Sequence, residues 1–316
     1  MSAAAGLIAA LVGAWLLGAV AERLRLPRVL GELAAGVLIG LAPSGFLKTD
    51  GALPLLAELG VLILLFETGL KSDLSHLRRS ARDSFAVACA GVAAPFLLGW
   101  GAMRALGYPG PSAVFVGAAM TATSVGITAR VLFDLGRLDA PESRIILGAA
   151  VIDDVLGLGI LAWLQAAASS GAVSWGPTAR SALIVAAFAA GALVARTPGR
   201  ARAERALKPA AALLVPLFFV SVGAQVRLGA CDPALLVLLS ALAAAGKLAS
   251  GWAARERRVN RWAVGAGMIP RGEVGLVFAQ VGLASGAIGP PLYSAVVGMV
   301  VLTTFAAPIL LKRVFR

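Results

Sequence analysis

Two adjacent carboxylic acids, Asp153 and Asp154, lie near the middle of a long apolar stretch of the sequence. If that stretch crosses a membrane, each charge costs roughly 3 kcal/mol there, so it persists where it has a partner, water or a function. Neighbouring residues of a helix point about 100° apart, so one acid can meet a counter-charge while the other faces a cavity. Two ionised acids side by side also repel each other, which suits the pair to proton uptake. The alternative is a structural pair that hydrogen bonds alone satisfy.

Lys247 is another charge inside an apolar stretch, about seven residues from the end of that stretch. Its aliphatic stem is long enough to carry the ammonium toward the membrane interface. Alternatively, Lys247 pairs with Asp153 or Asp154, which offsets part of the desolvation cost of both charges. An ion pair that ligand binding makes and breaks would act as a switch.

Two further stretches combine helix-breaking residues with polar groups. The first is Met120-Thr-Ala-Thr-Ser-Val-Gly126, and the second is Gly267-Met-Ile-Pro-Arg-Gly-Glu-Val-Gly275. Broken helices at membrane depth are tolerated where they line a cavity, and paired interruptions in the two halves of a chain indicate a transporter site. An intact helix with tolerated glycine and proline is the alternative, and it fits the first stretch better than the second.

The composition is that of a membrane protein. The 316 residues are 59% hydrophobic and 14% charged, with a mean hydropathy of +0.88, whereas a soluble domain carries about 25% charged residues. Apolar runs of about 16 to 26 residues are long enough to cross a bilayer as helices. We therefore expect an all-α polytopic protein with about eleven crossings, at about 1–22, 27–42, 51–70, 84–106, 111–134, 143–168, 178–196, 206–228, 233–254, 261–285 and 289–311.

The basic residues predict the orientation of these helices. Between spans they alternate: 22 of the 28 fall on one side and four on the other, while Lys247 and Arg271 fall within spans. Retention of positive loops in the cytoplasm then places the N-terminus outside and the C-terminus inside, with the protein in the inner (plasma) membrane. Because the formal charge of +12 lies at helix ends, it indicates the lipid bilayer and no nucleic-acid partner. The loops are too short to hold a catalytic domain, so we expect no enzyme.

A family resemblance extends along nearly the whole chain. The sequence resembles the monovalent cation/proton antiporter superfamily, and within it the bacterial NapA-type Na⁺/H⁺ antiporters, the branch with paired aspartates. The aspartate pair is its most specific element. The runs that carry the resemblance are Thr121-Ala-Thr-Ser-Val-Gly-Ile-Thr-Ala-Arg-Val131, Ser143-Arg-Ile-Ile-Leu-Gly-Ala-Ala-Val-Ile-Asp-Asp-Val-Leu-Gly157, Pro270-Arg-Gly-Glu-Val-Gly275, Leu26-Pro27 with Gly31-Glu-Leu-Ala-Ala-Gly36, and Leu213-Leu-Val-Pro-Leu-Phe-Phe-Val-Ser-Val-Gly223.

The resemblance implies an inverted-repeat fold with two crossed discontinuous helices. It also implies an elevator-type exchanger, in which a core domain moves against a more static scaffold that forms a homodimer. On this basis we expect scaffold helices at 1–82 and 206–230, a linker helix at 171–205, and core transport helices at 83–170 and 231–316.

The same resemblance implies the transported ions and their binding residues. Asp154 would bind either a cation or protons, and Asp153 would pair with Lys247. Inward proton flow would then expel the cation, which we expect to be Na⁺, with Li⁺ or K⁺ as the alternatives. More than one proton per cation would make the exchange electrogenic.

Four further residues receive supporting roles from the resemblance. Thr123 and Ser124 would lie at the first helix break beside the ion, and Arg271 and Glu273 would stabilise the second break. No cofactor is implied.

The sequence departs from this branch between about Arg196 and Ala206, where two of the usual thirteen crossings are missing from the scaffold. Three other functions remain as alternatives. An intramembrane aspartyl protease needs two aspartates that meet from separate helices, whereas the aspartates here are adjacent. A sodium-coupled symporter of an organic acid shares the use of broken helices. A truncated scaffold could have lost transport altogether. Cation dependence of proton flux separates the three.

Overall fold

The computed structural model describes residues 3–24, 26–41, 52–71, 80–169, 175–256 and 258–315, and every regular element within these ranges is a helix. Seven of the described helices are long and apolar enough to cross a membrane. The predicted all-α membrane fold is therefore confirmed, while the count of eleven crossings stays a prediction. Six basic residues used to predict the orientation lie outside the described residues, namely Arg25, Lys48, Arg78, Arg79, Arg257 and Arg316.

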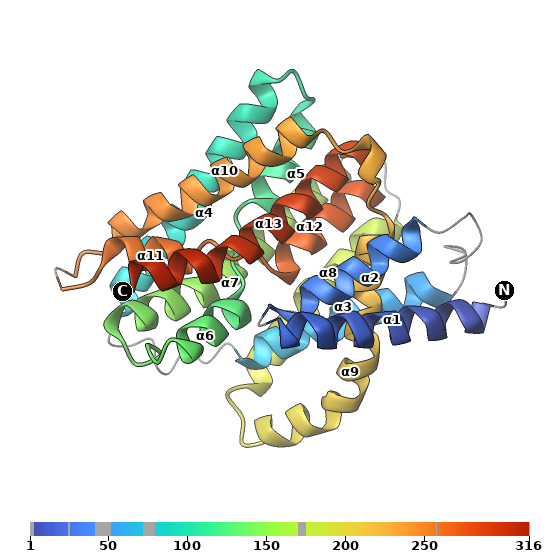
Figure 1. Ribbon diagram of the computed structural model, residues 1–316, viewed down its shortest axis with the longest axis horizontal. Coiled ribbons are helices and arrows are strands. Elements are labelled where there is room, and N and C mark those ends of the chain that lie inside the picture. The colour runs from blue at the N-terminus through green and yellow to red at the C-terminus, as the bar shows by residue number, and fades with distance from the viewer. Residues whose placement is uncertain are drawn as a thin grey trace. The chain divides into compact units, whose positions relative to one another are not determined.

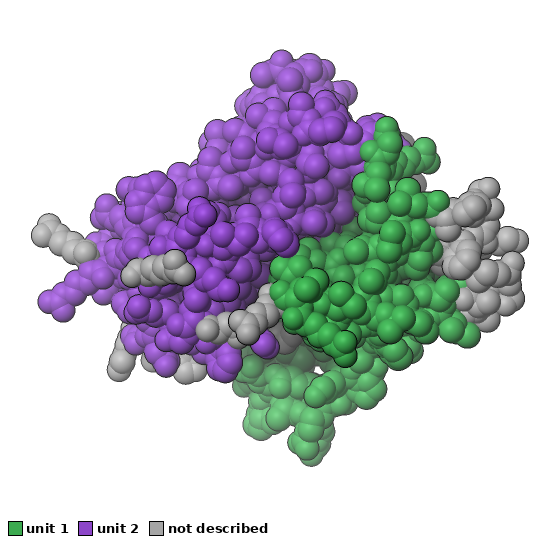
Figure 2. Space-filling view, viewed as in Figure 1, with its two compact units in different colours: residues 1–73, 169–229 green, residues 74–168, 230–316 purple. Residues whose placement is uncertain are grey.

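The chain divides into two compact units, shown in different colours in Figure 2. Unit 1 comprises residues 1–73 and 169–229, and unit 2 comprises residues 74–168 and 230–316. Each unit is built from two segments that are distant in the sequence. Helices of the first and second halves of the chain therefore pack together within each unit.

Unit 1 contains five long or medium helices. Helix α3 packs against α8 and α9, and α2 packs against α1 and α9. Glycine allows the closest of these approaches: a Cβ atom on Gly31 would collide with the Leu17 carbonyl of the neighbouring helix. The helices are α1 (Ala3–Arg23), α2 (Arg28–Gly40), α3 (Ala52–Lys71), α8 (Trp175–Val194) and α9 (Arg200–Ala224).

Unit 2 contains the same helical pattern twice, namely a long helix, two short helices and a second long helix. The first long helices of the two copies, α4 and α10, lie side by side, and Gly246 of α10 packs directly on Pro95 of α4 (Figure 1). Helix α13 packs against α10 and α12. The first copy is α4 (Ala81–Ala105), α5 (Gly110–Ala119), α6 (Val125–Asp134) and α7 (Pro141–Ser169), and the second is α10 (Pro233–Ser250), α11 (Arg261–Gly267), α12 (Glu273–Ala284) and α13 (Pro290–Val314).

Two predicted spans are each divided into two short helices. The span expected at 111–134 is α5 followed by α6, and the span expected at 261–285 is α11 followed by α12. The intact-helix alternative is therefore wrong for both. Helix α9 also begins at Arg200, six residues before the span expected at 206–228. The added turn is polar, and it is stabilised by an ion pair between Arg200 Nε and Glu204 Oε1 at 3.0 Å, one turn apart.

Candidate functional site

The first helix break consists of residues 120–124, between α5 and α6. Its residues favour local hydrogen bonds over helical ones, because short hydroxyl side chains compete with the backbone ladder. The Thr121 hydroxyl donates to the Ala118 carbonyl at 2.8 Å, at the end of α5. Ser124 then caps α6, with its hydroxyl oxygen accepting from the Ile127 N–H. The sequence therefore ends one helix and starts the next within five residues.

The second helix break consists of residues 268–272, between α11 and α12. Pro270 has no N–H to donate and disfavours helical geometry in the residue before it, so α11 cannot continue through it. Helix α12 starts directly after Gly272 with Glu273, and an acid in the first turn interacts favourably with the helix dipole.

The two breaks bind each other, although about 145 residues separate them in the sequence. The Ser124 N–H donates to the Pro270 carbonyl at 2.8 Å. The Thr123 hydroxyl donates to the Met268 carbonyl at 3.1 Å. Backbone groups that the breaks remove from helical hydrogen bonding thus find partners in the opposite break. This pairing satisfies the requirement that polar backbone groups at membrane depth be bonded within the protein.

Two contacts at this crossing extend the sequence prediction. The Thr128 hydroxyl of α6 donates to the Gly267 carbonyl at 2.8 Å, which ties α6 to the end of α11. Gly272 lies so close to Ser124 that a Cβ atom on it would stand 2.7 Å from the Ser124 Cβ. Thr128 was not among the residues predicted from the sequence. The sequence did contain a signal for it. Thr128 places a hydroxyl one turn after Ser124, in the first turns of the helix that follows the break.

Arg271 cross-links both breaks to a long helix. Its side chain is fully buried. One terminal nitrogen donates to the Ala122 carbonyl of the first break at 2.7 Å, and the other donates to the Ala243 carbonyl of α10 at 2.9 Å. The Thr304 hydroxyl of α13 holds the backbone of the same residue by donating to the Arg271 carbonyl at 2.6 Å. Arg271 therefore joins three segments, and Thr304 joins a fourth.

Asp153 and Lys247 form a buried ion pair. Lys247 Nζ lies 2.8 Å from Asp153 Oδ2, and both side chains are completely inaccessible to solvent. Lys247 therefore does not extend to the membrane interface, and the alternative of pairing with an aspartate is the one that the structure contains. Gly91 of α4 makes room for the ammonium, because a Cβ atom there would stand 3.4 Å from Lys247 Nζ. Asp153 also lies close enough to Thr123 and Arg271 to interact with them.

Asp154 lies next to this pair in the sequence, but no ion pair is formed by its own carboxylate among the described residues. It is 3% exposed, and its Oδ1 atom has no hydrogen-bond partner among the described residues. Asp153 Oδ1 and Arg271 Nε are likewise without a partner in the described part of the chain. Glu273 interacts electrostatically with Asp154 as a like charge, and Lys247 interacts with it as an opposite charge. The site therefore presents buried carboxylate oxygens that are available to a proton or to a cation.

All seven residues predicted from the sequence thus lie in unit 2. Helix α7 provides the two aspartates, α10 provides the lysine, and the two breaks with the start of α12 provide the others: Thr123, Ser124, Arg271 and Glu273. Oxygen ligands of this kind suit hard cations. A carboxylate beside an ammonium and a second carboxylate can also exchange protons with them. The arrangement is therefore suited to binding a monovalent cation and protons at one place.

A model of the family described as sodium/hydrogen exchanger, transmembrane, matches residues 7–184 and 178–316. The chain is 35% identical to the high-affinity Na⁺/H⁺ antiporter NhaS3 of Synechocystis sp. over 399 aligned positions, covering 95% of this chain and 87% of the relative. It is 32% identical to the Na⁺/H⁺-K⁺ antiporter GerN of Bacillus cereus, covering 95% of this chain and 93% of the relative. Because the first alignment is longer than the 316 residues of this chain, that relative contains segments that this chain lacks.

A solved structure has the same fold. The sodium proton antiporter MjNhaP1 of Methanocaldococcus jannaschii superposes with a TM-score of 0.73, over 98% of this chain and 97% of that chain, at 15% sequence identity.

Proposed function

The chain belongs to the sodium/hydrogen exchanger family, and we propose that it exchanges a monovalent cation, Na⁺ first, for protons across the membrane. Relatives at 35% and 32% identity carry the name of Na⁺/H⁺ antiporters. The observation that carries the proposal is the Asp154 carboxylate, buried with an unpartnered oxygen beside the Lys247–Asp153 ion pair. A transporter needs such a group, because a carboxylate can hold the cation or a proton.

Competition for Asp154 would couple the two ions. A bare cation at Asp154 Oδ1 replaces the proton that the acid would otherwise hold. The same cation repels the ammonium of Lys247, which is already paired with the neighbouring Asp153. Cation binding would thus weaken the Lys247–Asp153 pair, and cation release would restore it. If Lys247 also loses its proton during this cycle, more than one proton moves per cation and the exchange is electrogenic.

Alternating access would follow an elevator mechanism. Every proposed ion-binding and supporting residue lies in unit 2, so this unit can carry the ion as one body. Unit 1, with helices α1, α2, α3 and α9, would be the more static scaffold and would form the homodimer. Helix α8 would link the two. The surplus of basic residues at one set of helix ends supports a cytoplasmic C-terminus and an external N-terminus in the inner membrane.

The oxygen ligands of the site are compatible with more than one monovalent cation. Carboxylate and hydroxyl oxygens accept Na⁺, Li⁺ and K⁺, and cavity size and ligand number decide among them. The name of one relative includes K⁺ as well as Na⁺. K⁺ is therefore the first alternative to Na⁺.

Proton flux in proteoliposomes tests the proposal. A pH gradient is imposed, Na⁺, Li⁺, K⁺ or choline is added in turn, and proton movement is followed with a pH-sensitive dye. We expect flux with Na⁺ that is lost in Asp154→Asn and retained in Asp139→Asn, a matched change of an exposed aspartate before α7. A membrane-potential dye in the same vesicles reports electrogenicity.

Two outcomes would contradict antiport. Sodium uptake that requires an organic acid and leaves pH unchanged would identify a symporter. A folded protein that gives no cation-dependent flux with any of the three alkali cations would identify a scaffold that has lost transport.

A further inference from the structure

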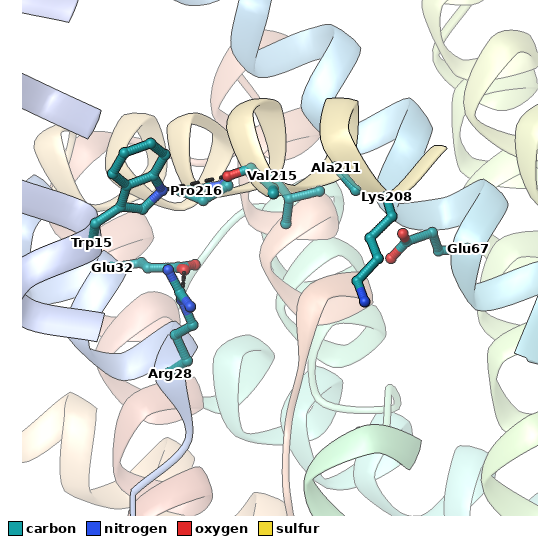
Figure 3. Close-up of a pocket in the computed structure, with 9 residues that line it drawn as sticks. Trp15, Arg28, Glu32, Glu67, Lys208, Ala211, Val215 and Pro216 are labelled. Carbon is teal, nitrogen blue, oxygen red and sulfur yellow. Dashed lines mark hydrogen bonds and ion pairs between the residues drawn. The ribbon is translucent and has the colours of Figure 1, made fainter. Parts of the chain in front are cut away.

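Unit 1 contains a charged groove that the proposed ion exchange does not use. It has a volume of about 420 Å³, within the range of about 300–1,000 Å³ that is common for ligand sites. Helices α1, α2, α3 and α9 line it, and Figure 3 shows Arg28 and Glu32 on one side of the groove, Glu67 on the other, and Lys208 extending from α9. The lining residues are Trp15, Arg28, Glu32, Glu67, Lys208, Ala211, Ala212, Val215 and Pro216.

The Arg28 guanidinium is held in place by its neighbours. Its Nε atom donates to Glu32 Oε1 at 3.0 Å, and the Glu32 side chain is only 5% exposed. The side chain of Arg28 also lies over Gly18 of α1, where a Cβ atom would stand 3.0 Å from Arg28 Cγ. The two terminal nitrogens of Arg28 have no hydrogen-bond partner among the described residues. Glu32 therefore orients a guanidinium whose outer donors remain available.

Lys208 supplies a second cation to the same groove. Its ammonium has no ion pair or hydrogen bond within the described part of the chain, and the residue is exposed. Figure 3 shows the ammonium extending below α9, with Glu67 to one side and Arg28 across the groove. Glu67 takes part in an interaction of its own. Two basic side chains with available donors therefore converge on one groove.

The remaining wall of the groove is apolar. Trp15, Val215 and Pro216 form much of it, and Trp15 is fixed by a hydrogen bond of 3.4 Å from its Nε1 to the Ala212 carbonyl of α9. Arg28 is the first residue of α2, and Glu67 lies in the last turns of α3. The groove therefore lies near helix ends, at the level where tryptophan and basic side chains meet lipid headgroups.

We propose that this groove binds the phosphate of an anionic membrane phospholipid. Arg28 and Lys208 contact the phosphate oxygens, and one acyl chain lies along Trp15, Val215 and Pro216. Basic pockets between transmembrane helices on the cytoplasmic side are suited to such headgroups, and arginine binds phosphate through two parallel donors. The proposed orientation puts these helix ends on the cytoplasmic side. The lipid site does not depend on the ion exchange proposed above.

Native mass spectrometry of the detergent-purified protein tests this site. Phosphatidylglycerol and phosphatidylcholine are titrated separately against the full chain. We expect bound phosphatidylglycerol at lower concentrations than phosphatidylcholine. Lys208→Gln should weaken phosphatidylglycerol binding about fivefold, in line with the contribution of one basic residue near the membrane surface. Arg202→Gln is the matched control, because Arg202 is an exposed residue of α9 outside the groove, and it should leave binding unchanged.

A second variant separates shape from charge. Ala212→Leu enlarges an exposed side chain of the groove without changing a charge, and we expect it to reduce phosphatidylglycerol binding as well. Equal binding of the two lipids by the unmodified protein, or equal losses in Lys208→Gln and Arg202→Gln, would overturn the proposal. Competition by free glycerol phosphate at the same concentration as the lipid would overturn the lipid assignment and leave a site for soluble phosphate esters.

Discussion

The hydroxyl of Thr304 on α13 donates a hydrogen bond of 2.6 Å to the backbone carbonyl of Arg271, inside the second helix break. Both residues are almost completely buried. The bond fixes the backbone from which the Arg271 side chain extends to the Ala122 and Ala243 carbonyls. A helix outside the crossing thus determines the direction of the side chain that holds the crossing together.

Removing this hydroxyl should impair the site. Thr304→Val keeps the shape of the side chain but leaves the buried Arg271 carbonyl without its partner, which costs about 1–3 kcal/mol. We expect a lower unfolding temperature in detergent and a higher cation concentration for half-maximal proton flux, with recovery of both in Thr304→Ser. Thr303→Val is the matched control, because the Thr303 hydroxyl bonds only to carbonyls of its own helix, Met299 and Val300. Equal effects of the two valine variants would refute the role of Thr304.

Removing one member of the Asp153–Lys247 pair should destabilise the protein more than removing both. Asp153→Asn leaves a buried ammonium without its counter-charge, a change that destabilises by about 3–5 kcal/mol. We expect Asp153→Asn with Lys247→Gln to unfold at a higher temperature than either single variant, because no uncompensated charge remains at this position. A thermal unfolding series of the four proteins measures this coupling. Additive losses in the double variant would show that the pair contributes no coupling energy.

Gly272 should not tolerate a methyl group. In Gly272→Ala the new Cβ would stand 2.7 Å from the Ser124 Cβ, so the two breaks must separate. Overpacking of this kind costs about 1–3 kcal/mol. We expect a lower unfolding temperature and a loss of most cation-dependent flux. Gly126→Ala is the control, since a Cβ atom on Gly126 meets nothing within 4 Å. Normal flux in Gly272→Ala would mean that the close approach of the breaks is not required.

Cys231 offers a test of orientation and of local charge. It lies between α9 and α10, and its partial burial and the neighbouring Asp232 raise the pKa of its thiol. The reactive thiolate is therefore scarce at neutral pH, and labelling by a membrane-impermeant maleimide should accelerate as the pH is raised. In a Cys89→Ser background, we expect labelling of intact cells from the outside. Labelling only after the cells are opened would reverse the proposed orientation.

A charge-neutral variant of the neighbour isolates the electrostatic part of this effect. Asp232 caps α10 by accepting from the Ala234 N–H, and asparagine can cap in the same way. Asp232→Asn should therefore keep the helix intact while lowering the thiol pKa, so labelling of Cys231 becomes faster at neutral pH. An unchanged rate would assign the slow reaction to burial alone.

The sequence was sufficient to predict the fold class and to single out the charged residues that the structure brings together in unit 2. Charged residues in apolar stretches have few explanations, so Asp153, Asp154, Lys247 and Arg271 stand out without any structure. Helix breakers within spans likewise predicted both interruptions. The hydrogen-bond partners of the two breaks were harder to predict. Hydroxyls such as those of Thr128 and Thr304 are common in membrane helices, and they bond to the backbone of their own helix as readily as to another segment. The carbonyls that accept from Arg271 could not be predicted either, because they depend on how two segments far apart in the chain cross.

The mutual bonding of the two helix breaks constrains the order in which this protein can mature. The Thr123 hydroxyl and the Ser124 N–H obtain their partners from Met268 and Pro270, which the ribosome adds about 145 residues later. Until then these two donors of the first break lack their partners, so water or other polar groups must take the place of those carbonyls. A nascent chain that ends before α11 therefore lacks the groups that would stabilise its first half.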